Sequence, residues 1–141
     1  MITITPFNPQ NAQEIAGAYQ RFMTVANTQY QWPGDPIPLE MFLPVLQTGL
    51  FEGYCIYDDA NCVGFFLLER NEVNVLDARL MYLDAHVSQK IAVNALFQRM
   101  LSDYADRDFD TVSIPLLGSA VQEWVNYTGW NAFKPVGQIV F

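Results

Sequence analysis

Three strand-like segments follow one another with no helical segment between them, and this arrangement constrains the fold most. Residues 52–57 and 62–69 are apolar runs separated by the polar stretch Asp-Asp-Ala-Asn, which is typical of a hairpin turn. The second run is apolar on both faces, as in a strand that is covered on both sides. Residues 73–84 form a third and longer strand. The pattern therefore predicts a central sheet that is packed on both faces.

The remaining segments supply helices and further strands around this sheet. Residues 1–5 alternate like a strand, and residues 11–26 repeat apolar side chains at a helical period. A shorter helix is expected over residues 39–49, with Pro44 either kinking it or marking its first turn. Ser88 is a reasonable N-cap for a third helix, which is amphipathic because its apolar residues lie on one face. We then expect a strand at 110–115, a helix at 118–129 and one or two closing strands at 130–141.

Composition limits the class of protein. A chain of 141 residues, 51% of them hydrophobic, suits a single globular α/β domain (residues 1–141) with a proper core. The net charge is −8 and the basic residues are spread singly, so we expect neither nucleic acid nor a membrane as partner. The first residues carry no basic, apolar leader pattern, so the expected location is the cytoplasm.

The two cysteines flank the predicted hairpin turn. If Tyr57 faces Cys62, then Cys55 lies diagonally across from Cys62, which is too far for good disulfide geometry. We therefore expect two free thiols, as in a reducing compartment. His86 is the only histidine, so the sequence predicts no metal site.

The order β–α–α–β–β–β–α–β–α–β resembles that of the GNAT superfamily of N-acetyltransferases. Four stretches carry the resemblance along nearly the whole chain: "MITITPFNPQNAQEI", "DDANCVGFFLLE", "ARLMYLDAHVSQ" and "AVQEWVNYTGWNAF". The resemblance implies a GNAT-like α+β fold. Its centre would be a mixed, mostly antiparallel, twisted sheet of six to seven strands, flanked by about four helices.

The resemblance also implies a site for acetyl-CoA or another acyl-CoA. In the family, acyl-CoA lies in a V-shaped opening between the fourth and fifth strands. Its thioester carbonyl meets a backbone N–H at a bulge in the fourth strand, for which the matching positions are Tyr82 and Leu83. The pyrophosphate would sit on the following loop and helix start, whose residues here are Ser88, Gln89, Lys90, Ile91, Ala92 and Val93.

This helix start lacks the glycines of the family pattern. Without gaps, the three glycine positions hold Gln89, Ile91 and Val93; a shifted register gives Ala92 and Asn94 but breaks the apolar spacing of the helix. β-Branched side chains there would stand between the backbone amides and a pyrophosphate, so we expect weak acetyl-CoA binding. The alternative is that Ile91 and Val93 pack inward and the anion site is shut.

Catalytic and acceptor groups are less clear from the sequence. The family's general-acid tyrosine position holds Val125, and Tyr127 lies about 200° away around the helix. Asp77 is a candidate general base, acting directly or through water; otherwise it faces solvent or pairs with Arg79. Tyr30 and Trp32, in the loop between the first two helices, either form a wall of the acceptor pocket or cap the core.

Two functions remain open at this stage. One is an acyl-CoA-dependent N-acyltransferase that acetylates a small amine, and the other is a catalytically inactive GNAT-fold protein that binds a ligand or another protein. The segment "GQIVF" is expected to be an exposed edge strand, and since GNAT-like proteins often pair there we predict a homodimer.

Overall fold

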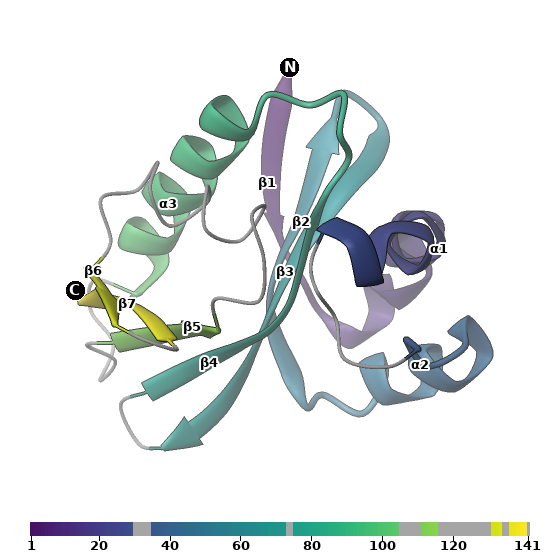
Figure 1. Ribbon diagram of the computed structural model, residues 1–141, viewed down its shortest axis with the longest axis horizontal. Helices are drawn as coiled ribbons and strands as arrows, with labels where there is room; N and C mark the ends of the chain where they lie inside the picture. The colour runs from purple at the N-terminus through teal and green to yellow at the C-terminus, as the bar shows by residue number, and fades with distance from the viewer. Residues whose placement is uncertain (30–34, 73–74, 105–110, 116–130, 134–135, 141) are drawn as a thin grey trace.

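The computed structural model describes residues 1–29, 35–72, 75–104, 111–115, 131–133 and 136–140. Seven strands form one sheet in the order β1-β2-β3-β4-β5-β7-β6, with α1 and α2 on one face and α3 on the other (Figure 1). The strands are β1 (Ile2–Pro6), β2 (Phe51–Asp58), β3 (Asn61–Glu72), β4 (Val75–Leu83), β5 (Thr111–Pro115), β6 (Asn131–Phe133) and β7 (Val136–Val140). The helices are the short 3-10 turn η1 (Pro9–Asn11), α1 (Ala12–Gln29), α2 (Leu39–Leu46) and α3 (Gln89–Tyr104).

The predicted sheet is confirmed. It is mixed because β4 and β5 run parallel, while the other neighbouring strands are antiparallel. The helices predicted at 11–26 and 39–49 and the one beginning after Ser88 are present, and the fourth predicted helix, at 118–129, lies outside the described residues. None of the helices in the described part is both long and apolar enough to cross a membrane.

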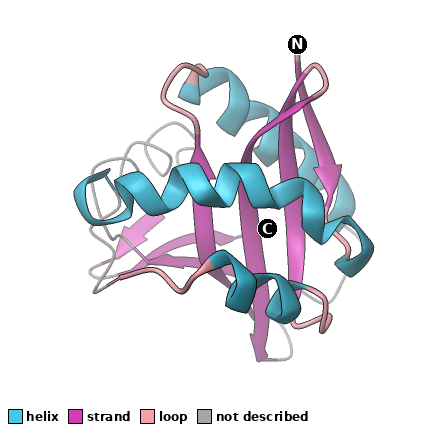
Figure 2. Cartoon of the chain, turned by 90° about the vertical axis from the view of Figure 1, so that its right-hand side faces the viewer, coloured by secondary structure: helices cyan, strands magenta, loops and turns pink. Residues whose placement is uncertain are grey.

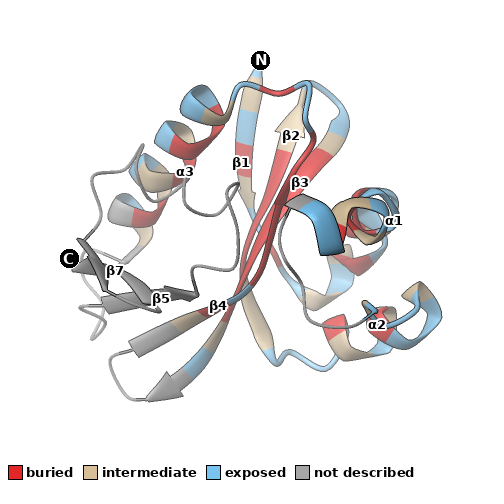
Figure 3. Ribbon diagram, viewed as in Figure 1, coloured by how far each residue is buried: buried red, intermediate tan, exposed pale blue. Residues whose placement is uncertain are grey.

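Aromatic rings join α1 and α2 to the sheet. The Tyr19 ring stacks on Phe42 of α2, with ring centres 4.0 Å apart, and Phe22 meets Phe65 of β3 edge to face. Figure 2 shows α1 lying across the strands with α2 beneath it. Figure 3 shows the buried residues concentrated in β2, β3, the end of β4 and the helix faces turned toward them. Burying such rings supplies most of the free energy that holds this layer together.

Pro44 does not mark the first turn of α2. The helix begins at Leu39, so Pro44 stands in its interior, where it removes one backbone hydrogen bond. The helix ends soon afterwards, and the backbone N–H of Gln47 bonds back to Leu43 and Pro44. Apolar burial of Phe42 and Leu46 compensates for the lost hydrogen bond and keeps this short helix in place.

The β2–β3 hairpin has the expected pairing of Tyr57 with Cys62, with a register shift between Ile56 and Tyr57. Both cysteines are free, as the sequence predicts. The Cys55 thiol is hydrogen-bonded to Cys62, and this bond together with burial raises the pKa of Cys55.

The C-terminal strand is not the outer edge that the sequence suggested. β7 lies between β5 and β6, because Thr111–Pro115 pairs with one side of it and Asn131–Phe133 with the other. β6 covers β7 over Val136, Gly137 and Gln138. Strand order depends on contacts between distant segments, which an apolar pattern does not encode. The homodimer stays a prediction, without the exposed edge from which it was argued.

Candidate functional site

β4 and β5 stay together over three residue pairs only. Val75, Leu76 and Asp77 pair with Thr111, Val112 and Ser113, whereas residues 78–83 of β4 have no partner in β5. Figure 1 shows the two strands diverging beyond this point. Beyond Asp77, therefore, β5 does not pair with this edge of β4, and a backbone edge that parts from its neighbouring strand is where an extended ligand can pair.

The backbone of β4 decides which N–H groups face that edge. The N–H of Asp84 donates to the carbonyl of Val63 at 2.8 Å. Since successive residues of an antiparallel strand alternate in direction, the N–H of Tyr82 also points toward β3, whereas those of Met81 and Leu83 point away from it. Of the two positions implied by the family resemblance, Leu83 has the required orientation. Met81 is a position that the sequence reasoning missed, although counting back from the hairpin register could have found it.

The bulge in β4 also lies elsewhere than expected. Tyr82 and Leu83 pair regularly with Phe65 and Gly64, whereas Leu80 and Ala78 pair with the adjacent residues Leu67 and Leu68. Arg79 is therefore the extra residue of the bulge. The apolar run Leu80–Leu83 carries no alternation from which the position of a bulge could be read.

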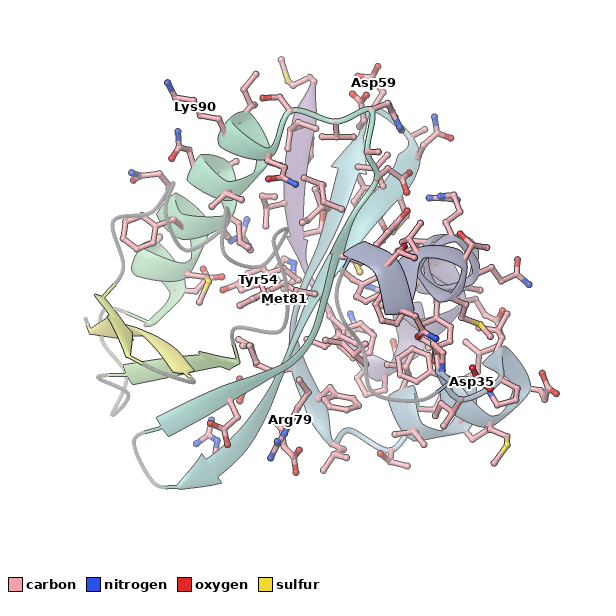
Figure 4. The ribbon with its side chains drawn as sticks, in the orientation of Figure 1. Asp35, Tyr54, Asp59, Arg79, Met81 and Lys90 are labelled. Carbon is pink, nitrogen blue, oxygen red and sulfur yellow. The ribbon has the colours of Figure 1, made fainter. Side chains whose placement is uncertain are left out.

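The start of α3 is capped as the sequence predicts. The N–H of Ile91 donates to Ser88 Oγ at 3.4 Å, and the N–H of Ala92 makes the first backbone bond to the Ser88 carbonyl at 3.0 Å. The N–H groups of Gln89 and Lys90 precede that bond, and such first-turn groups are available to an anion. Lys90 is exposed and points outward from the helix (Figure 4). Gln89 Oε1 is buried and has no hydrogen-bond partner among the residues that the structure describes.

The two β-branched residues of this turn point in different directions. Val93 is 1% exposed and Ala92 is fully buried, so both pack toward the sheet. Ile91 is 59% exposed and stands at the surface of the first turn. Neither alternative from the sequence therefore describes both residues: Val93 packs inward, and Ile91 alone occupies space beside the free amides.

Asp84 fixes the loop that leads into α3. This residue is 6% exposed, and its Oδ1 accepts hydrogen bonds from the Tyr82 hydroxyl at 2.5 Å and from Arg21 Nε at 2.9 Å. Arg21 also donates from a terminal nitrogen to the Cys62 carbonyl at 2.7 Å, so α1, the hairpin and the loop meet here. The hydrogen bond to Asp84 raises the pKa of the Arg21 guanidinium. The sequence reasoning missed this role, although Asp84 is the last residue of the predicted strand.

A pocket of about 280 Å³ lies beside the β4 bulge, on the α1–α2 face. Arg79 stands at this pocket, with Nε 2.9 Å from a Glu69 carboxylate oxygen and a terminal nitrogen 3.6 Å from Asp77. Asp77 therefore pairs with Arg79, which was one of the two alternatives to a catalytic role. The lining residues come from five elements and one connector: Tyr19, Asp35, Ile37, Phe42, Val45, Phe51, Glu69, Arg79 and Leu80.

Tyr30, Trp32, Val125 and Tyr127 lie outside the described residues. The described end of the same α1–α2 connector does reach the pocket, since Asp35 and Ile37 line it. In the part of the chain that the structure describes, no three His, Cys, Asp or Glu side chains are grouped so that they could hold a metal ion.

Comparison with known proteins finds similarity in structure but not in sequence. No family model matches the chain, and neither does any curated protein. A ribosomal-protein-alanine N-acetyltransferase from Brucella melitensis biovar Abortus 2308 superposes with a TM-score of 0.67 at 15% identity, covering 94% of this chain and 96% of that one. A GNAT-family acetyltransferase from Staphylococcus aureus Mu50 gives 0.69 at 14% identity, covering 99% of both chains.

A Salmonella typhimurium protein solved with acetyl-CoA gives a TM-score of 0.72 at 10% identity, covering 99% of this chain and 93% of that one. At such identities a full-length superposition establishes the fold. The parted fourth and fifth strands and the capped helix after the fourth strand agree with it. The chain therefore has the fold of the GNAT superfamily of N-acetyltransferases.

Proposed function

We propose that this chain is an acyl-CoA-dependent N-acyltransferase that transfers an acetyl group to a small amine. The observation that carries the proposal is the course of β4. The strand leaves β5 after Asp77, presents the N–H groups of Met81 and Leu83 on the parted edge, and ends at the loop that positions the capped start of α3. The fold shared with acetyltransferases supports the same reaction by analogy.

The residues present fit an acyl-CoA in part. The N–H of Met81 would bind one of its carbonyls, and the first-turn N–H groups with Lys90 would favour its pyrophosphate. The unsatisfied Gln89 Oε1 provides an acceptor for a donor group of the bound molecule. Ile91 opposes the fit, because its exposed side chain stands where close approach of an anion requires none.

The chemistry requires one proton acceptor near the amine. The acyl-CoA supplies an acyl group activated as a thioester: the amine nitrogen attacks the carbonyl carbon, a C–N bond forms and the C–S bond breaks. The amine loses one proton and the departing thiolate gains one. Asp77, where β4 and β5 part, is the proposed acceptor for the amine proton, directly or through water.

The acceptor belongs in the pocket beside Arg79. This pocket adjoins the point of parting, and the α1–α2 connector lines it through Asp35 and Ile37. The proposal keeps Tyr30 and Trp32, from the same connector, as a further wall of the acceptor site. The alternative function, a GNAT-fold module without acetyl transfer, is favoured by one observation, the exposed Ile91 at a position where the family has glycine.

Acetyl-CoA is expected to raise the melting temperature only slightly, and Ile91→Ala is expected to enlarge the shift. Binding to the folded state alone stabilises it by RT ln(1 + [L]/Kd), about 2.7 kcal/mol at a ligand concentration of 100 Kd. Alanine removes the branched side chain beside the amides and keeps the helix intact. Thermal melts of both proteins with millimolar acetyl-CoA measure the difference.

Gln98→Ala is the matched control, because Gln98 is exposed on the same side of α3 but two turns away from its start. It should respond to acetyl-CoA as the parent protein does. Absence of any shift in the parent, in Ile91→Ala and in Lys90→Ala would favour the non-enzymatic module. A large shift already present in the parent would show that the missing glycines matter little.

Asp77→Asn is expected to lower kcat about 100-fold with little change in the KM for acetyl-CoA, because proton transfer by a positioned carboxylate contributes on this order. Steady-state acetylation kinetics measure it. Glu52→Gln is the matched control, since Glu52 also pairs with an arginine but lies away from the parted edge. Equal losses in both variants would exclude Asp77 as the proton acceptor.

A further inference from the structure

The bulge in β4 turns the positively charged side chain of Arg79 toward a mostly apolar pocket. Adjacent side chains of a regular strand point to opposite faces of the sheet, so Arg79 and Leu80 would ordinarily be separated. The bulge at Arg79 brings both to the same pocket. Bulges commonly re-aim a side chain next to an active site, and here the re-aimed side chain is a guanidinium. Figure 4 shows Arg79 at the sheet and Asp35 on the side of the connector and α2.

The body of the pocket suits one apolar group. The rings of Tyr19, Phe42 and Phe51 and the side chain of Leu80 form most of the apolar wall, together with Ile37 and Val45. The charged side chains of Asp35, Glu69 and Arg79 complete the lining. Its volume of about 280 Å³ lies near the lower end of the range for small-molecule sites. An occupant therefore places a side chain of the size of leucine or phenylalanine here, and a longer molecule would extend out of it.

The charged side chains at the rim of the pocket suit a ligand that carries both a carboxylate and an amine. Arg79 is half-exposed, and its contacts to Glu69 and Asp77 use Nε and one terminal nitrogen. A guanidinium has further N–H donors in a fixed fork that suits a second carboxylate. The Arg79 nitrogen lies 3.6 Å from Asp77, so a carboxylate held by Arg79 would bring a nitrogen one carbon away to the side of Asp77.

Resting on the proposed acyltransferase function, we propose that the acceptor is a hydrophobic α-amino acid. Its apolar side chain occupies the pocket among Tyr19, Phe42 and Phe51, its carboxylate binds Arg79, and its α-amino group faces Asp77. The spacing of Arg79 and Asp77 selects an amine adjacent to a carboxylate over an amine without one, and the apolar wall selects against acidic side chains.

The test is direct binding of L-leucine to the full chain, measured by saturation-transfer NMR and calorimetry, both with and without acetyl-CoA. L-Leucine is compared with 3-methylbutylamine, which has the same side chain and amine but no carboxylate, and with L-aspartate. Both comparison ligands are expected to bind at least tenfold more weakly. Arg79→Gln should weaken the binding of L-leucine at least tenfold and leave the binding of 3-methylbutylamine unchanged. Arg70→Gln, another half-exposed arginine paired with a glutamate, should change neither.

The outcomes separate this inference from the proposed function. Binding of L-leucine through Arg79 without any acetyl transfer supports the pocket assignment and contradicts the acyltransferase. Acetyl transfer to amines with no preference for L-leucine over 3-methylbutylamine overturns the pocket assignment and leaves the acyltransferase standing. Absence of L-leucine binding in either condition, or binding that survives in Arg79→Gln, also overturns it. Ile37→Asp, at an exposed part of the wall, should weaken the binding of both L-leucine and 3-methylbutylamine if the apolar side chain of the ligand occupies this pocket.

Discussion

Gly53→Ala is expected to lower the free energy of unfolding by about 4 kcal/mol, a large part of the stability of an ordinary domain. A Cβ at this position would lie 2.0 Å from the carbonyl oxygen of Phe66 and 3.1 Å from the Cα of Leu67, both backbone atoms of the neighbouring strand. The backbone φ of +137° is itself strained for any residue with a side chain. Relief would require β2 and β3 to separate where the Gly53 carbonyl also accepts from Phe7.

Two other glycines provide controls for this prediction. Gly49 has a φ of +82°, but a Cβ there would meet no other atom within 4 Å, so Gly49→Ala should cost only about 1 kcal/mol. Gly17 lies inside α1 with its nearest neighbour at 3.5 Å, so Gly17→Ala should stabilise the protein by about 0.5–1 kcal/mol. Urea denaturation of the three variants measures the order of their free energies of unfolding. A loss in Gly53→Ala no larger than that in Gly49→Ala would contradict the steric argument.

The close approach at Gly53 recurs one strand further along the sheet. A Cβ on Gly64 would lie 2.3 Å from the Tyr82 carbonyl oxygen, so this glycine lets β3 approach β4 closely just before β4 enters the site. The sequence analysis identified the hairpin that contains Gly64 from polar turn residues between two apolar runs. Local patterns of this kind are what a sequence encodes most directly.

Features that depend on one extra residue or on distant segments could not be predicted. Charged and apolar residues alternate from Leu76 to Leu80, but the apolar run Leu80–Leu83 that follows does not show where the extra residue lies, so the bulge that turns Arg79 toward the acceptor pocket could not be located. The place of β7 between β5 and β6 is set by its pairing with both of these strands, which are separate segments of the chain. Ser88 could be predicted because an N-cap is a local signal, whereas the contacts of Asp84 join three segments that are far apart in sequence.

Asp84→Ala is expected to lower the free energy of unfolding by about 3 kcal/mol and to weaken acetyl-CoA binding as well. The substitution leaves the buried Tyr82 hydroxyl without the oxygen that accepts its hydrogen bond, and it leaves the Arg21 guanidinium without its carboxylate. Asp58→Ala, which removes a more exposed carboxylate, should change stability by no more than about 0.5 kcal/mol. Urea denaturation measures the stabilities, and thermal melts with acetyl-CoA measure the binding.

A double-mutant cycle of Arg21→Ala and Asp84→Ala shows whether this network serves the site or only the core. Because the two side chains are in contact, the loss of stability in the double variant should be smaller than the sum of the two single losses by about 1 kcal/mol or more. The Asp84 carbonyl accepts from the Val87 N–H, one residue before the helix cap, so displacing Asp84 moves the first turn of α3. Arg21→Ala leaves the hydrogen bond from the Tyr82 hydroxyl to Asp84 in place, and we expect it to reduce stability while leaving the response to acetyl-CoA nearly intact. If both single variants weaken acetyl-CoA binding equally, the loss follows from general destabilisation, and Asp84 has no separate role in positioning the helix start.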